Sequence, residues 1–150
     1  MGLKNRCTFV SINYIKFYAY GHPNIKATHK STLEITKENY LTSRGTCIIG
    51  IGSNISCLDL PNYIKERIKT RNSRIILSIC VDELREYIFG YGSDKLTLKS
   101  GISMVFRKSD YMDERTVMIK ANKSASDINR RIISRLRNKG KPAEFILIVY

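Results

Sequence analysis

The sequence is poor in several residue types, and each shortage excludes a class of protein. It has no tryptophan, three prolines and nine glycines, too few of the last two for a collagen-like or Pro/Gly-rich chain. Its apolar runs reach only about five residues, far below the ~20 that a membrane-spanning helix needs. The first residues contain no apolar signal-peptide segment, and Arg6 stands where a myristoylation motif requires Ser or Thr. We therefore expect a soluble, cytoplasmic protein.

Acidic residues are scarce relative to basic ones. The chain of 150 residues has 13 Asp and Glu against 26 Lys and Arg, a formal net charge of +13 at pH 7. Solubility requires a net charge of only about 2–8 in a small domain. A larger surplus repels itself unless an anionic partner neutralises it. Nucleic acid, an anionic membrane surface and an acidic protein are the candidate partners. We favour nucleic acid, with plain solubility as the alternative.

Cysteine is present only as four scattered residues: Cys7, Cys47, Cys57 and Cys80. No two are spaced as CxxC, the pair that a structural zinc site normally contains. We expect reduced thiols that act as small hydrophobic residues in a reducing compartment. The chain also has no P-loop, and its glycine-rich run at 50–55 stops short of the dinucleotide-binding pattern GxGxxG. The sequence therefore predicts no metal and no cofactor.

The pattern of apolar residues predicts one α+β domain over residues 1–150. Runs of β-branched and aromatic residues predict strands at 6–20, 25–36, 46–51, 74–81, 85–91, 102–107, 115–120 and 143–150. Helices are predicted from about 59 to 69 and from a capping-box-like start at 124–127 to about 138. The order βββαββββαβ, with isolated helices and no internal repeat, favours a mostly antiparallel or mixed β-sheet, or a partly open barrel, with two helices.

Two stretches, on both predicted helices and their flanks, concentrate the basic residues. They contain Lys65, Arg67, Lys69, Arg71 and Arg74 in the first, and Arg130, Arg131, Arg135, Arg137, Lys139 and Lys141 in the second. Glu66 is the only acidic residue in the two stretches. The arginine fork fits a phosphate with two hydrogen bonds. If both helices covered one face of the sheet, these residues would form a continuous basic face for RNA. Solvated helix faces are the alternative.

Aromatic residues lie close to lysines near the N-terminus. Tyr14, Phe17, Tyr18 and Tyr20 are neighbours of Lys16 in the first predicted strand. Exposed tyrosines of this kind can stack on unpaired bases. The alternative is that these rings belong to the core and keep only the phenol tip in water.

A second candidate site lies in two polar segments. The first contains His22, His29, Lys30 and Glu34, and the second contains Arg107 and Asp110. A histidine base, a basic anion clamp and an orienting carboxylate are the parts of a phosphate-handling site. If the segments converge, the protein would be a small enzyme or ligand-binding protein acting on a phosphorylated metabolite or nucleotide. Turn chemistry and a local ion-pair network are the alternative.

The same segments carry a resemblance to a known family. The runs AYGHPNI at 19–25, THKSTLEIT at 28–36, LT and GTCIIG within 41–50, and RKSD and RT within 107–116 resemble an archaeal family of small proteins, domain of unknown function 371. The similarity extends from about residue 17 to about 137. It implies an archaeal source and no particular reaction. The family pattern has an aspartate before Cys47, where this sequence has Thr46, so a site that uses that carboxylate would be absent.

We therefore expect an RNA-binding protein associated with the ribosome. Its partners would be ribosomal RNA and neighbouring ribosomal proteins, contacted through the basic residues of two helices, with no membrane partner. Enzymatic activity is left open and is not the favoured interpretation. The phosphate-handling pocket is the alternative from another class. A third hypothesis is a protein that docks on an acidic partner.

Overall fold

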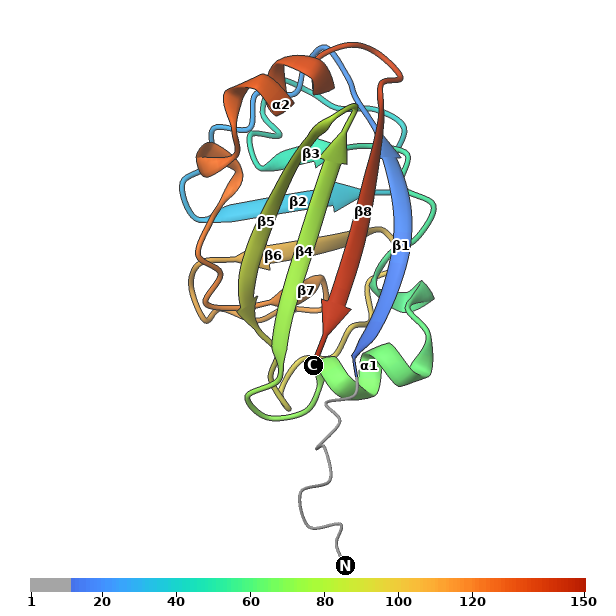
Figure 1. Cartoon of the computed structure of the whole chain (residues 1–150), viewed down its shortest axis with the longest axis vertical. Helices are drawn as coiled ribbons and strands as arrows, with labels where there is room; N and C mark the ends of the chain where they lie inside the picture. Colours follow the sequence, from blue (N-terminus) through green and yellow to red (C-terminus); the bar gives the residue numbers. More distant parts are fainter. Residues whose placement is uncertain (1–11) are drawn as a thin grey trace, which may run out of the picture.

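Two four-stranded β-sheets pack face to face with their strands crossing, and one helix lies at each end of the front sheet (Figure 1). The computed structural model describes residues 12–150. The part of the first predicted strand before residue 12, and with it Cys7, lies outside the described residues. The predicted α+β class is confirmed, and so is the order βββαββββαβ.

The front sheet is antiparallel throughout and contains the four long strands in the order β1-β8-β4-β5. Its strands are β1 (Asn13–Tyr20), β4 (Arg74–Val81), β5 (Leu84–Tyr91) and β8 (Pro142–Val149). The rear sheet has the order β3-β2-β6-β7 and is mixed, because its central pair is antiparallel and both outer pairs are parallel. Its strands are β2 (Thr32–Thr36), β3 (Ile48–Gly50), β6 (Ser103–Arg107) and β7 (Thr116–Met118). Single bridges, Tyr20 with Ile51 and Tyr91 with Ile119, link the sheets without closing a barrel.

Two short helices follow the same local design. Helix α1 (Asn62–Ile68) follows a 3-10 turn, η2 (Cys57–Asp59), and helix α2 (Arg130–Leu136) follows η3 (Ala125–Asp127). The predicted capping box at 124–127 exists, but it caps η3, and α2 begins later with Asn129 accepting a hydrogen bond from the Arg131 N–H at 2.8 Å. The predicted start of that helix was therefore too early.

The second predicted strand was also too long. Residues 25–31 form a loop, and only Thr32–Thr36 joins the rear sheet. Ala27 has φ of +50°, which interrupts an extended chain. Ile25 and Ala27 are nevertheless fully buried, so the alternation that predicted a strand reflects loop side chains anchored in the core.

The core lies between the sheets and under the helices. Phe17 and Phe145 stack there with ring centroids 5.2 Å apart. Each helix buries one apolar stripe, Ile64 and Ile68 in α1 and Ile132 and Leu136 in α2. Full burial of each such side chain stabilises the fold by about 1.5–3 kcal/mol.

The two halves of the chain repeat one arrangement of elements. β1–β4 and β5–β8 each run as three strands, a 3-10 turn, a helix and a strand, and exchanging the halves reverses both sheet orders. The hydrogen bonds repeat too: Tyr18 N–H donates to Asn54 Oδ1 at 2.8 Å, and Phe89 N–H to Asn122 Oδ1 at 2.9 Å. The expectation of no internal repeat was therefore wrong. The repeat follows backbone geometry more closely than side-chain identity.

In the front sheet, the first strand of each half pairs with the last strand of the other half. Within the front sheet, β1 pairs with β8 of the second half, and β5 pairs with β4 of the first half. Neither half can therefore complete the front sheet alone, and the described residues form a single domain.

Gly21 and Gly92 are equivalent positions in the two halves. A Cβ at Gly21 would clash with the Leu136 carbonyl oxygen, and one at Gly92 with the Ile68 carbonyl oxygen. Because these atoms belong to helix backbone, they cannot move aside easily. We expect Gly21→Ala and Gly92→Ala each to lower the free energy of unfolding by about 1–3 kcal/mol, measured by urea denaturation.

Gly101→Ala is the matched control. The nearest atom to a Cβ there is Leu58 Cδ2 at 3.9 Å, an ordinary contact, so its unfolding free energy should stay within about 0.5 kcal/mol of the original protein. Equal unfolding midpoints for all three variants would contradict the close packing of β1 and β5 ends against the helices.

Candidate nucleic-acid interface

The two predicted basic stretches lie at opposite ends of the molecule. Helix α1 lies where β1 begins, and α2 lies at the other end of the front sheet (Figure 1). Helix α1 packs on β1 and β8, and α2 on β3, β4 and β5. The structure therefore does not bring the two stretches into one continuous basic face. It presents two separate surfaces.

At the α2 end, part of the positive charge is engaged within the fold. The Arg130 guanidinium donates to the carbonyls of Ala27 and Ala125. Arg135 pairs with Asp82 at 2.6 Å and with Glu83 at 3.0 Å, and Lys141 also pairs with Asp82. The remaining basic residues of the stretch are exposed and have no acidic partner within residues 12–150. They are Arg131, Arg137 and Lys139, named here the α2-end cations.

The α1 end has the same division. Lys65 donates to the Leu58 carbonyl at 2.8 Å, and Arg67 is half-buried with its Nε enclosed. Three others are exposed, and none of them has an acidic partner in the described part of the chain. They are Lys69, Arg71 and Arg74, named here the α1-end cations.

Between the two ends, the outer face of the front sheet is open. In Figure 1 this face is turned toward the viewer, and no described segment crosses it. Its edge strands carry a row of exposed rings: Tyr14, Tyr18 and Tyr20 on β1, and Tyr87, Phe89 and Tyr91 on β5. We name these six residues the aromatic sheet face. Phe17, predicted with the tyrosines, is instead buried against Phe145.

The three β5 rings were not among the predicted site residues. Their signal in the sequence is the alternation of residues 84–91, in which Ile88 and Gly90 point to the core and Tyr87, Phe89 and Tyr91 point outward. That alternation predicted the strand but not the side of the sheet that would stay uncovered.

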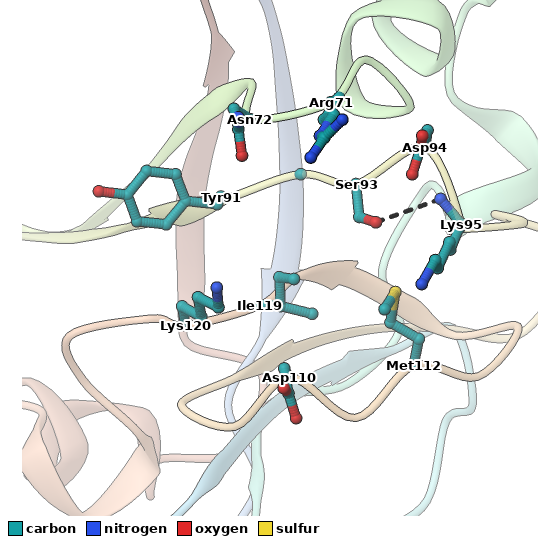
Figure 2. Close-up of a pocket in the computed structure, with 11 residues that line it drawn as sticks. Arg71, Asn72, Tyr91, Ser93, Asp94, Lys95, Asp110, Met112, Ile119 and Lys120 are labelled. Carbon is teal, nitrogen blue, oxygen red and sulfur yellow. Dashed lines mark hydrogen bonds between the residues drawn. The ribbon is translucent and has the colours of Figure 1, made fainter.

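Two cavities meet at the α1 end of β5. The larger has a volume of about 680 Å³ and lies between residues 71–72, 91–95, 110–112 and 119–120 (Figure 2). The smaller, of about 340 Å³, is lined by Arg74, Phe89, Asn122 and Tyr150. Tyr91 and Lys120 line both cavities, which we together name the β5 trough.

The two histidines of the alternative site make local turn contacts. His22 Nδ1 accepts the Asn24 N–H at 3.0 Å, and His29 Nδ1 accepts the N–H groups of Ser31 and Thr32 at 3.2 and 3.1 Å. In the second half of the chain, Ser100 Oγ makes the equivalent two bonds. A serine can thus do what His29 does here, which is the behaviour of a turn-stabilising residue.

Glu34 lies on the outer face of the rear sheet, in a buried polar cluster. Its Oε2 accepts from Ser103 Oγ at 2.7 Å, and its Oε1 lies 3.4 Å from Cys47 Sγ and 3.6 Å from Arg115. Burial and then Glu34 raise the pKa of Cys47 to about 12. The thiol is therefore protonated at neutral pH and is not an activated nucleophile.

Arg107 belongs to the adjoining part of this cluster. It donates to Thr116 Oγ1 at 2.9 Å and to Asp113 Oδ2 at 3.0 Å, while its guanidinium lies over the Tyr111 ring. Burial by itself would raise the pKa of Asp113, but hydrogen bonds from Arg115 and Thr116 and the charge of Arg107 lower it to about 2. The cluster is an internally neutralised network.

The two polar segments lie side by side, because β2 pairs with β6 and Thr32 is opposite Arg107, but Glu34 and Asp110 border different cavities. Glu34 borders a cavity of about 310 Å³ together with Glu38 and Glu114, and Asp110 borders the larger cavity of the β5 trough. Lys30 is exposed in the loop before β2. Across residues 12–150, no group of three or more His, Cys, Asp or Glu is arranged to hold a metal ion.

The cysteines partly match their expectation. Cys57 is buried, with burial and then Asp113 raising its pKa to about 12. Cys47 and Cys80 are half-buried, and all three are free thiols.

The fold and its surfaces define a class: an α+β protein built from a repeated unit of three strands, a helix and a strand. The chain belongs to the family described as "Domain of unknown function (DUF371)", whose model matches residues 17–150. It is 48% identical over 131 residues to "Uncharacterized protein MJ0206" of Methanocaldococcus jannaschii, a match that covers 87% of this chain and 96% of the relative. The resemblance predicted from the sequence is confirmed. Among the described helices, none has the length and apolar character that crossing a membrane demands.

The lowered pKa of Asp113 predicts a dependence of stability on pH. The folded-state pKa of Asp113, about 2, lies below the ordinary 3.8. Its contribution to the free energy of unfolding is therefore fully present above about pH 4 and is lost as the pH falls from about 4 toward 2. We expect Asp113→Asn to lower the unfolding free energy by about 2 kcal/mol at pH 7, with a smaller difference at pH 3.

Urea denaturation from pH 3 to pH 7 measures this difference. Asp110→Asn is the control, because Asp110 is exposed in the same loop and forms no ion pair within residues 12–150. A difference for Asp113→Asn that does not change with pH would contradict the assigned network.

Proposed function

We propose that this protein binds RNA through the α1-end and α2-end cations. The observation that carries the proposal is their lack of acidic partners among residues 12–150, in a chain whose other cations include many that are ion-paired or bonded to carbonyls. Unpaired arginines and lysines on a surface favour phosphate, because neutralising phosphates releases condensed counterions. The net charge of +13 adds long-range attraction to a polyanion.

The separation of the two ends supports a large ligand. The strands of the front sheet have eight residues each and so span about 25 Å. A ligand that contacts both groups of cations must bridge that distance, which a mononucleotide cannot do and a folded RNA can. The aromatic sheet face lies between them and offers rings on which unpaired bases stack.

Ribosomal RNA, with neighbouring ribosomal proteins, is the partner that we propose to test first. Cell extract fractionated by sedimentation should show the protein travelling with ribosomal particles at low salt and leaving them at high salt, since the contacts are electrostatic. Sedimentation of the protein away from the particles at every salt concentration would remove the ribosome from the proposal and leave RNA binding to the measurements below.

Charge-removing variants test RNA binding directly. The double variants Lys69→Gln/Arg71→Gln and Arg131→Gln/Arg137→Gln should each weaken binding of a structured RNA and reduce the slope of log affinity against log salt. The expected reduction is about 0.7–0.9 for each phosphate that the variant no longer neutralises. Filter binding over a range of salt concentrations measures both quantities.

The control is Lys37→Gln/Lys108→Gln, which removes the same charge from residues paired with Asp59 and Asp127. This variant should bind nearly as the original protein does. A salt-independent affinity, or an equal weakening of binding in the control and the two test variants, would rule out the proposed interface.

A further inference from the structure

The internal repeat allows the two ends of the front sheet to be compared position by position. At the α2 end, the Asn24 side chain donates to the Leu41 carbonyl at 2.7 Å and ties two loops together. At the α1 end, the equivalent positions are Lys95 and Met112, and both line the larger cavity (Figure 2). The loops that Asn24 ties together at the α2 end thus correspond to loops that frame an open cavity at the α1 end.

The two ends also differ at the position of Lys120, where the chain has a positive φ. Lys120 has φ of +52°, and its equivalent in the first half is Gly52 with φ of +61°. Glycine adopts this conformation without steric cost, whereas a side chain there is strained. Strained residues cluster at binding and catalytic sites, where the surroundings hold them in place. Here the strained position supplies a lysine to the wall that the two cavities share.

The lining of the β5 trough combines cations with aromatic rings. Arg71, Lys95 and Lys120 line the larger cavity and Arg74 the smaller one, with Tyr91 between them. Figure 2 shows the Tyr91 ring at the end of the cavity where Lys120 lies. Rings stack on bases, and cations next to them bind the phosphates that follow each base along a strand.

Two carboxylates, Asp94 and Asp110, also line the larger cavity. Their negative charges would repel a phosphate, so the cavity as a whole is not simply a phosphate site. They suit a nucleotide, because a carboxylate accepts hydrogen bonds from ribose hydroxyls. The 2′-hydroxyl is present in RNA and absent from DNA, so these acids favour RNA.

We propose that the β5 trough binds single-stranded RNA, with one base stacked on Tyr91 and the adjoining phosphates held by Arg71 and Lys120. This proposal rests on RNA binding as the proposed function and names the part of the RNA that the α1 end takes. The base must be unpaired, because a base within a duplex cannot expose its face to the ring. The second cavity, with Phe89 and Tyr150, continues the path for the next nucleotide.

The test measures fluorescence anisotropy with a labelled octamer of uridine, U8, at low salt. Tyr91→Ala should weaken U8 binding about 5- to 100-fold, the range for loss of one base–aromatic stack. Tyr40→Ala is the control, because Tyr40 is an exposed tyrosine that lies outside the aromatic sheet face and lines neither cavity of the β5 trough. Its affinity should change less than twofold.

Lys120→Gly separates binding from folding. It removes the cation and relieves the backbone strain, so U8 affinity should fall while the melting temperature stays equal or rises. A lysine with only a structural role would leave U8 affinity unchanged. The deoxy octamer dU8 should bind more weakly than U8, and Asp110→Asn should reduce that difference.

The outcomes distinguish this proposal from the proposed function. If structured RNA binds with a steep salt dependence but Tyr91→Ala and Tyr40→Ala have equal effects on U8, the trough proposal is wrong and RNA binding stands. If neither structured RNA nor U8 binds, both fail. If uridine monophosphate displaces U8 at concentrations near the dissociation constant of U8 itself, the occupant is a free nucleotide and the single-strand proposal is overturned.

Discussion

The pairing of strands across the two halves is the constraint on which the rest of the structure depends. β8 lies between β1 and β4, so the second half of the chain supplies a central strand next to two strands of the first. The front sheet joins strands of both halves, and the helix of each half lies at one end of it. The two groups of cations are consequently far apart, with the aromatic sheet face between them.

The sequence predicted the element order and the longer strands because hydrophobic periodicity is a local property. β4 was predicted with its observed bounds, since residues 75–81 are apolar except for Ser78 and end at the Asp82–Glu83 turn. Residues 25–31 were misassigned because a loop with two core anchors, Ile25 and Ala27, has the same alternation as a strand. The repeat was missed because it is kept in backbone angles and hydrogen bonds, as at Gly52 and Lys120, where the residue types differ.

The candidate site was only partly predictable. The basic residues were identified by composition, but which of them remain unpaired depends on contacts between distant segments, such as Arg135 with Asp82. Glu34 and Arg107 were predicted from the sequence as candidate-site residues of two polar segments. The bond between Glu34 and Ser103 could not be predicted, because these residues are 69 positions apart in the sequence. Arg107 and Asp113 are only six apart and fit the local ion-pair network given as the alternative. Predicting the β5 trough would have required a comparison of the loops at both ends of the front sheet.

The position of β8 also has a consequence for how the chain acquires its structure. Residues 142–149 form one of the two central strands of the front sheet, and β1 has no other strand partner in that sheet. A nascent chain that lacks these residues leaves β1 without its ladder and one side of β4 unpaired. Contacts between strands so distant in sequence form slowly. We therefore expect the front sheet to assemble only after residues 142–149 have been synthesised, and a chain without them to lose the fold as a whole.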